Sequence, residues 1–483
     1  MAKDFIVAIE LGSSKITGMA GKKNPDGSIT ILAAASEDST SYIRKGVVYS
    51  IDKTTQGLSN IISKLKNSLQ ADITQVYVGI GGQSIHSVKN MVIKDLPMDA
   101  IVSQNMVNEL MDSNRNMTYP DYEIQDAITE EYKVDLQYQN DPVGIQASRL
   151  EGNFLNILWR RSFYRNINKS FDNAGIAIAE TYLAPLVMAD NVLTEAEKRA
   201  GCVLVDLGAE TTTVSVYYRD KLRSIAVIPL GGDNITKDLE SLQMEACEAE
   251  RMKLKYSSAI TDVADIDPTA ILPIDSNRSV ESRRFIEVVE ARTLEIIENV
   301  KSFIPSEYID KLLGGIIITG GGSNMTNIEK AFREITGVEK IRIAKFVTLN
   351  INSKDSKPEL RHDGTMNTIL SLIARGDMNC AGNPFGNSLF DNQQFNAAFT
   401  TGTTNGTTTT QPNATTPHET EEERTKREEK ERIAKEEAER IKQEEETRKA
   451  KEEEERKKNS PIHRFFGSLK QFGRSLVEPE NNE

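Results

Sequence analysis

The sequence predicts an α/β fold built from two similar halves and followed by a polar extension. Apolar strands alternate with helical segments, which is typical of α/β architectures. One pattern occurs twice, near residues 5 and 201: an apolar strand, a carboxylate, a glycine, a cluster of hydroxyl residues and a second strand. Large apolar side chains are concentrated before about residue 380, so the two halves can form a core and most of the remainder cannot.

The first half opens with a predicted β-hairpin. Residues 5–9 form an apolar run rich in β-branched side chains, and residues 16–20 are a second strand-like stretch. Glu10-Leu-Gly-Ser-Ser-Lys15 supplies the polar turn between them. Asp26-Gly27 marks the next turn. The elements that follow are predicted strands at residues 29–33 and 75–80 and a predicted helix at residues 53–70.

Residues 83–162 are predicted to form a small inserted α+β module. Short strands such as residues 87–93 alternate there with a helix near residues 103–112. The pattern of the first half is therefore interrupted before it returns.

The second half repeats the opening pattern. Gly201–Asp206 is predicted to be a buried strand, Leu207–Thr213 a polar turn, and residues 214–218 a second strand. A third related turn follows at Gly315–Gly322, where a strand runs into three glycines before a helix-like segment at residues 327–335.

These three turns have the composition of a nucleotide site. Glycine lets backbone N–H groups approach phosphate oxygens closely, and Ser and Thr hydroxyls add donors. A carboxylate at a strand end can hold Mg²⁺, directly or through its waters. Two such hairpins facing each other would clamp a triphosphate between the halves. The simpler alternative is three ordinary turns of an α/β protein.

The motifs resemble those of the actin/Hsp70/hexokinase-type ATPases. Glu10–Lys15 is similar to their first phosphate loop, Asp206–Thr212 to the second, and Ile318–Ser323 to the adenosine motif. Glu250-Arg-Met-Lys253 is similar to the Glu-x-x-Lys pair that contacts the nucleoside. Within this superfamily, residues 225–238 are similar to the FtsA family of bacterial division proteins. Residues 282–285 and 366–376 also fit that family, and the resemblance covers about residues 4–382.

The resemblance implies a set of ATP and Mg²⁺ contacts. The residues implied at the phosphates are Gly12, Ser13, Ser14, Lys15, Gly208, Thr211 and Thr212. Those implied at the nucleoside are Gly231, Gly232, Glu250, Lys253, Gly320, Gly321, Gly322 and Ser323. Glu10 and Asp206 would hold the metal.

The resemblance also implies an architecture: an actin-like, two-lobed ATPase fold with two duplicated RNase H-like halves. Its expected parts are subdomain 1A at 4–82 with 163–197 and 363–382, inserted subdomain 1C at 83–162, subdomain 2A at 198–231 with 306–362, and subdomain 2B at 232–305. Members of the family polymerise and tether filaments of the tubulin-like protein FtsZ, with other division proteins, to the cytoplasmic membrane at the septum.

Departures from the superfamily pattern predict weak ATP hydrolysis at most. Glu10 stands where Asp is usual, and Ala209-Glu210 replace glycines of the second loop. Thr213 occupies a commonly acidic position, and Ala184 precedes Pro185 where hydrolysing relatives often carry a residue that positions water. Small displacements reduce catalysis strongly, so binding is expected to survive better than turnover. The alternative is a small-molecule kinase or other ATPase of the superfamily, which needs an acidic base beside a substrate pocket.

The extension after the globular body has three parts. Residues 383–418 are rich in Asn, Thr and Gly and are predicted to be a disordered linker. Residues 419–458 are nearly all Glu, Lys, Arg and Ala, with repeated Glu-to-basic pairs four residues apart. They form either a solvated helix or a charged tether, and both serve as a spacer.

Residues 460–478 are predicted to form an amphipathic helix that binds the membrane surface. Ser460 and Pro461 suit its start, and Pro479 its end. Arg464, Lys470 and Arg474 flank an apolar face. That face comprises Ile462, Phe465, Phe466, Leu469, Phe472 and Leu476. Such a helix suits anionic lipid; the alternative is a helix that docks on the body or on a partner.

Charge and composition narrow the class of partner. The net charge of −13 argues against nucleic-acid binding. The three cysteines and four histidines show no metal or disulfide spacing, which predicts a reducing, cytosolic compartment. No apolar run is long enough to span a bilayer, and the first residues do not resemble a signal peptide. Arg283, Arg284 and Arg292 lie on a predicted helix and are candidates for an acidic FtsZ segment; a solvated helix face is the alternative.

Overall fold

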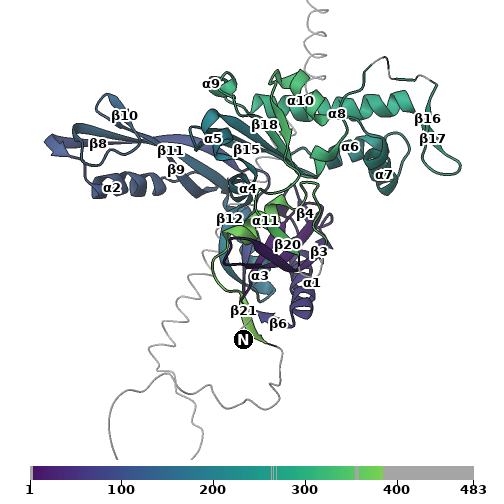
Figure 1. The fold of residues 1–483 in the computed structure, drawn as a ribbon, viewed down its shortest axis with the longest axis horizontal. Coiled ribbons are helices and arrows are strands. Elements are labelled where there is room, and N and C mark those ends of the chain that lie inside the picture. Colours follow the sequence, from purple (N-terminus) through teal and green to yellow (C-terminus); the bar gives the residue numbers. More distant parts are fainter. Residues whose placement is uncertain (1–3, 263, 265, 268, 354–357, 385–483) are drawn as a thin grey trace, which may run out of the picture. The chain divides into compact units, whose positions relative to one another are not determined.

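The computed structural model describes residues 4–384, except 263, 265, 268 and 354–357. Two large β-sheets with helices packed against them form the fold (Figure 1), which confirms the predicted α/β class. The predicted linker, charged spacer and amphipathic helix lie outside the described residues. No helix among those residues is both long and apolar enough to cross a membrane.

The first sheet is built on the predicted N-terminal hairpin. Its six strands follow the order β12-β7-β1-β2-β3-β20. They are β1 (Ile6–Leu11), β2 (Lys15–Lys23), β3 (Ile29–Asp38), β7 (Gln75–Ile80), β12 (Ala177–Leu183) and β20 (Ile351–Ser353). Gly18 of β2 packs on Ile61 of α1 (Ile51–Leu69), while Gly21 packs on Ile373 of α11 (Asn367–Arg375). Small residues on β2 therefore let both helices approach the sheet closely.

The second sheet joins the other half to the inserted module. Its nine strands follow the order β10-β9-β11-β8-β15-β14-β13-β18-β19. The strands of the second half are β13 (Cys202–Leu207), β14 (Thr212–Tyr218), β15 (Lys221–Ile228), β18 (Gly315–Thr319) and β19 (Ile341–Ile343). Those of the module are β8 (His86–Ile101), β9 (Tyr122–Val134), β10 (Gln137–Gln139) and β11 (Gln146–Arg160). The two groups of strands meet where His86 of β8 pairs with Ala226 of β15.

The expectation of short strands in the inserted module was wrong. β8 has 16 residues and β11 has 15, and both are bent rather than interrupted. Pro97 is tolerated within β8 because, at that point, β11 is the only neighbouring strand that β8 pairs with, and the pairing register is irregular opposite Ser148. The predicted helix is present as α2 (Gln104–Arg115).

Strands that are buried on both faces explain the continuous apolar runs in the sequence. Along β13, Cys202 and Leu204 belong to the core beneath the first sheet, whereas Val203 and Val205 belong to the core on the opposite face. A central strand covered on both sides has no polar face, so its sequence does not alternate.

The remaining elements complete four hydrophobic clusters. The helices are α3 (Arg161–Asn173), α4 (Ala184–Val192), α5 (Glu195–Ala200), α6 (Gly232–Glu240), α7 (Ala246–Tyr256), α8 (Ser282–Ser302), α9 (Ser306–Ile309), α10 (Ile328–Thr336) and the short 3₁₀ helix η2 (Gly321–Asn324). The short strands are β4 (Ile43–Arg44), β5 (Val47–Val48), β6 (Ala71–Ile73), β16 (Ile271–Pro273), β17 (Ser279–Glu281) and β21 (Ala381–Pro384). The predicted subdomain boundaries remain a prediction; β20, expected in the second half, extends the first sheet.

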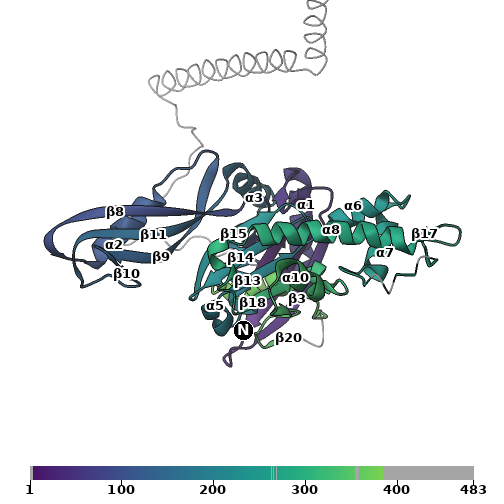
Figure 2. The same cartoon turned by 90° about the horizontal axis from the view of Figure 1, so that it is seen from above.

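The inserted module and the α6–α7 group lie on opposite sides of the central sheets in both views (Figures 1 and 2). Two segments of the chain connect the two halves of the fold. One passes from α4 through α5 into β13, and the other returns from β19 to β20.

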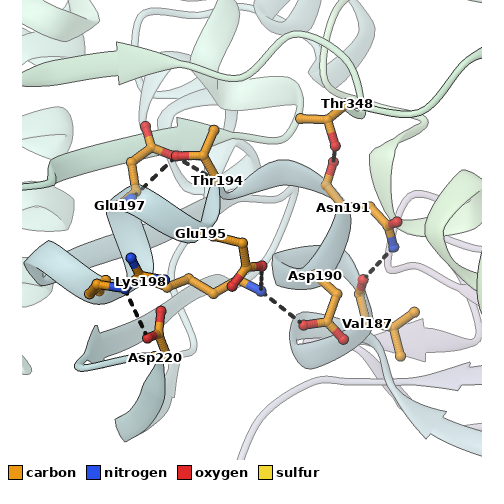
Figure 3. Close-up of polar contacts among 10 residues, drawn as sticks. Val187, Asp190, Asn191, Thr194, Glu195, Glu197, Lys198, Asp220 and Thr348 are labelled. Atoms are coloured by element: carbon orange, nitrogen blue, oxygen red, sulfur yellow. Dashed lines mark hydrogen bonds and ion pairs between the residues drawn. The ribbon is translucent and has the colours of Figure 1, made fainter.

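The two connections are tied to each other, as Figure 3 shows in part. The backbone N–H of Thr348 donates to the carbonyl of Asn191 at 2.8 Å, and the Thr348 hydroxyl donates to the same carbonyl at 3.0 Å. Thr194 and Glu197 form a capping box at the start of α5. Glu197 also accepts two hydrogen bonds of 2.9 Å from Arg342 of β19. These contacts hold the chain where it crosses between the halves.

We expect Glu197→Gln to lower the free energy of unfolding by about 1 kcal/mol at neutral pH, because it breaks the ion pair of a buried carboxylate with a partly exposed guanidinium. Burial opposes the charge, but Arg342 and the cap hold the pKa of Glu197 below its usual value. The stabilisation is therefore present above the unfolded pKa and is lost as pH falls through the folded one. Chemical denaturation near neutral pH and in acid measures the free energy of unfolding, with the exposed substitution Glu195→Gln as the control. The prediction is contradicted if Glu195→Gln lowers that free energy equally, or if the effect of Glu197→Gln is as large in acid as at neutral pH.

Candidate functional site

A cavity of about 680 Å³ lies between the two predicted hairpins, and the third turn also lines it. Most of the predicted nucleotide residues line this one cavity. They are Glu10, Gly12, Ser13, Ser14, Lys15, Asp206, Gly208, Thr211, Gly231, Gly232, Glu250, Lys253, Gly320, Gly321 and Gly322. The structure therefore brings together turns that are about 200 and 100 residues apart in the sequence.

Two predicted residues point into the protein instead. Thr212 is fully buried, and its hydroxyl donates to the carbonyl of Leu230 at 2.9 Å. Thr211 and Thr213 line the cavity, as expected from the alternation of side chains near a strand start. Ser323 is also buried, and its hydroxyl donates to the carbonyl of Gly320 at 2.7 Å. These two hydroxyls shape the turns and do not face the cavity.

The two hairpins are equivalent in register and turn geometry. Glu10 pairs with Thr17 across the first hairpin, and Asp206 pairs with Thr213 across the second. The N–H of Gly12 donates to the carbonyl of Lys15 at 3.1 Å, and the N–H of Gly208 donates to that of Thr211 at 2.9 Å. The predicted duplication is thus present at the level of individual hydrogen bonds.

Neighbouring glycines allow the cavity walls to close around the second hairpin. A Cβ at Gly231 would come within 2.5 Å of the carbonyl oxygen of Ala209. A Cβ at Gly320, whose φ of +82° already favours glycine, would come within 2.3 Å of the Asp206 carboxylate. Larger residues at these positions would push the second phosphate turn away from α6 and from the adenosine turn.

The carboxylates of Glu10 and Asp206 are the most perturbed acids of the cavity. Burial, together with the negative charge of Asp206, raises the pKa of Glu10 to about 7. Burial raises the pKa of Asp206 to about 6. Two buried acids that face one space cannot both ionise at low cost unless a cation lies between them. Their environment therefore fits a bound cation.

Mg²⁺ with a phosphate chain suits this pair. Mg²⁺ commonly uses one or two protein carboxylates and takes its other oxygens from water and phosphates. No group of three or more His, Cys, Asp or Glu side chains that could hold a metal was found among the described residues. The two carboxylates are thus suited to a metal that arrives with its own oxygen ligands.

The predicted nucleoside residues form one hydrogen-bonded cluster at the α6–α7 wall. Lys253 Nζ lies 2.6 Å from a Glu250 carboxylate oxygen. It also donates to the Thr236 hydroxyl at 2.8 Å and to the carbonyl of Gly232 at 3.0 Å. The Glu and Lys side chains are therefore held in place from both helices before any ligand binds.

Several cavity residues were missed from the sequence. Thr368 of α11 lines the cavity and hydrogen-bonds to Glu10. Arg361, Asp363, Gly364 and Thr365 also line it, from the segment that precedes α11. Thr368 lies in the segment 366–376 that fits the family, but no local motif marks residues 361–365, because the fold alone brings them to the cavity. The tight backbone contact of Gly364 with Gly320 could be recognised only once both chain segments were placed.

Glu210 faces away from the phosphate turns. One of its carboxylate oxygens accepts from the backbone N–H of Lys45, in the β4–β5 turn of the first half, at 2.6 Å. The other lies 3.4 Å from Lys237 Nζ of α6. An acid at this position therefore links the two halves and does not lie among the phosphate-binding groups.

Because Glu10 is more easily protonated in the folded protein than in the unfolded chain, stability without Mg²⁺ should fall as pH rises from about 4.5 to about 7. Glu10→Gln should remove up to about 3 kcal/mol of that change, since no charge then forms at this position. Thermal unfolding across this pH range, in a metal chelator, measures the effect. The exposed substitution Glu240→Gln is the control. If the stability of Glu10→Gln falls with rising pH as much as that of Glu240→Gln, the prediction is wrong.

For Glu210→Ala, we expect the amide hydrogen of Lys45 to exchange about tenfold faster, because its acceptor is lost. Hydrogen exchange followed by mass spectrometry measures this without any ligand. Glu287→Ala, at an exposed ion pair with Arg283, is a matched control. Unchanged protection of Lys45 would show that the contact does not persist in solution.

Comparisons with known proteins agree with this geometry. A family model described as "Cell division protein FtsA" matches residues 203–361, and one described as "SHS2 domain inserted in FTSA" matches residues 82–158. The FtsA protein of Porphyromonas gingivalis is 32% identical over 352 residues, which cover 71% of this chain and 74% of that protein. The FtsA protein of Neisseria meningitidis is 29% identical over 369 residues, covering 71% and 88%.

A solved structure supports the fold. The PilM–PilN type IV pilus biogenesis complex contains a chain that matches with a TM-score of 0.53 at 14% identity, covering 77% of this chain and 98% of the other. The match concerns the fold alone. Together with the family models, it confirms the predicted actin-like fold with an inserted module.

Proposed function

Because this chain belongs to the FtsA family of bacterial cell division proteins, we propose that it is an ATP-dependent assembly protein that tethers FtsZ filaments to the membrane at the septum. Its cofactors would be ATP and Mg²⁺, and its partners FtsZ, other division proteins, anionic lipid and further copies of itself. The observation that carries this proposal is the single cavity shared by two equivalent hairpins and the adenosine turn.

ATP with Mg²⁺ would act as a bridge between the two halves. The first hairpin would hold the phosphates through Ser13, Ser14 and Lys15, and the second through Gly208 and Thr211. Glu10 and Asp206 would hold the metal and release protons as it binds, given their raised pKa values. The nucleotide would favour the closed arrangement only as far as it binds that arrangement more tightly.

The same cavity is poorly equipped for turnover. Ala184 and Pro185 line it where a residue that orients water would be needed, and neither side chain can accept a proton. Glu10 is held by Thr368 and repelled by Asp206. We infer that nucleotide binding and exchange control assembly, with ATP hydrolysis slow. Family membership favours this function over the small-molecule kinase.

Partner binding on α8 is proposed for Arg283 and Arg284. Both are exposed at the start of the helix, and Arg283 makes a surface ion pair with Glu287. Such pairs contribute little and exchange partners readily. Arg292 is already held by Asp238 through two hydrogen bonds, of 2.5 and 3.1 Å. It is therefore the least available of the three for an acidic segment of FtsZ.

The membrane anchor is proposed for residues 460–478, which lie outside the described residues. Its three Phe side chains and its Arg and Lys residues suit an anionic membrane surface. A single such helix binds reversibly, and many helices on one filament bind far more tightly. Assembly in the presence of ATP would therefore strengthen membrane attachment.

We expect full-length protein to co-sediment with vesicles that contain anionic lipid, and more of it to do so with ATP and Mg²⁺ than without them. Phe465→Glu, Phe466→Glu and Phe472→Glu combined should reduce the bound fraction at least about tenfold, because they place charges on the buried face. Thr407→Glu, Thr408→Glu and Thr409→Glu combined change the net charge equally within the linker and serve as the control. Unchanged sedimentation of the Phe variant would refute the anchor.

A further inference from the structure

We propose that Arg361 and Lys15 form a pair of cations in the cavity that binds the phosphate chain of the nucleotide. This proposal rests on the ATP site proposed above and assigns a further binding residue to it. Both side chains line the cavity, but they come from opposite ends of the folded chain.

The backbone that carries Arg361 is fixed against the adenosine turn. The side-chain amide of Asn324 donates to the carbonyl of Asp363 at 2.7 Å. Gly364 has a φ of +77°, and its N–H donates to the carbonyl of Lys345 at 2.7 Å. A Cβ at Gly364 would lie 3.1 Å from the backbone nitrogen of Gly320. Arg361 is therefore held at a defined place beside the turn that the nucleoside would contact.

The two cations of the cavity interact with each other and lack a close ion-pair partner among the described residues. In the part of the chain that the structure describes, neither side chain forms an ion pair or a hydrogen bond with a carboxylate. Burial, and then the positive charge of Arg361, lower the pKa of Lys15. Two like charges on one cavity, without an anion between them, repel each other. A bound polyphosphate would remove that repulsion.

The acids nearby only partly balance this charge. Asp363 interacts with both cations, but one of its oxygens already accepts the N–H and the hydroxyl of Thr365, at 3.0 and 2.5 Å. Glu10 also interacts with Lys15, and its carboxylate is the one suited to the metal. The metal would thus neutralise the acids, while the phosphate chain would take the two cations.

The arrangement gives Arg361 a distinct role. A guanidinium presents several donors in a plane and binds phosphate oxygens in pairs. Lys15, by contrast, offers a single ammonium group as a point charge. The contribution of Arg361 to nucleotide affinity should then increase with the charge of the phosphate chain. Adenosine, which has no phosphates, should bind equally well without Arg361.

The test compares full-length wild type with Arg361→Gln and Arg361→Lys, and uses Arg375→Gln as the control. Arg375 is exposed and lies over the ring of Tyr182, outside the cavity lining. Calorimetry would measure the affinity for ATP, ADP and adenosine in the presence of Mg²⁺. We expect Arg361→Gln to weaken ATP about 10- to 100-fold and adenosine less than about twofold, since only charged contacts are lost. Arg361→Lys should recover part of the ATP affinity.

A second readout separates binding from a structural role. Without nucleotide, Arg361→Gln should unfold at the same temperature as wild type or at a higher one, because a repulsion is removed. A structural role predicts a lower temperature, and that result would overturn the proposal. Equal ATP affinity of wild type and Arg361→Gln would also overturn it while leaving the ATP site intact. Wild type that binds neither ATP nor ADP would overturn the ATP site and this proposal together.

Discussion

The site depends on two carboxylates whose simultaneous ionisation is costly unless a cation lies between them. Glu10 and Asp206 end equivalent strands in the two halves, and their negative charges face one cavity. Lys15 acts on Glu10 but also interacts with Arg361. The divalent cation with phosphates proposed above would satisfy both acids at once. Such a ligand would contact both halves of the duplicated fold.

The lining of the cavity fits the proposed binding of a nucleotide better than its hydrolysis. Its walls are glycine turns that permit close approach, and its nucleoside side is preorganised by the contacts among Thr236, Glu250 and Lys253. The place of a water-positioning side chain is taken by Ala184 and Pro185. A protein that uses the nucleotide as a structural bridge benefits from slow chemistry, because the bridge then lasts as long as the assembly.

Local motifs made the central part of the site predictable. A strand, a carboxylate and a glycine turn are contiguous in sequence, so both hairpins and the adenosine turn could be recognised without a structure. Thr212 was misplaced because side chains alternate along β14 and its neighbours take the cavity face. Arg361 could not be recognised, since only the packing of Gly364 on Gly320 brings its segment to the cavity. Glu210 follows the second loop in sequence, but its partner, the N–H of Lys45, is 165 positions away in the chain.

The crossing point between the halves restricts how they can move. The chain passes there twice, and Thr348 joins the two passages by holding the carbonyl of Asn191. Glu197 and Arg342 add a second fastening close by. Two chain segments that are hydrogen-bonded side by side resist sliding and twisting more than they resist bending about the line that joins them. Any opening of the two halves would therefore be easiest as bending about this line, with the largest displacement at the edge farthest from it.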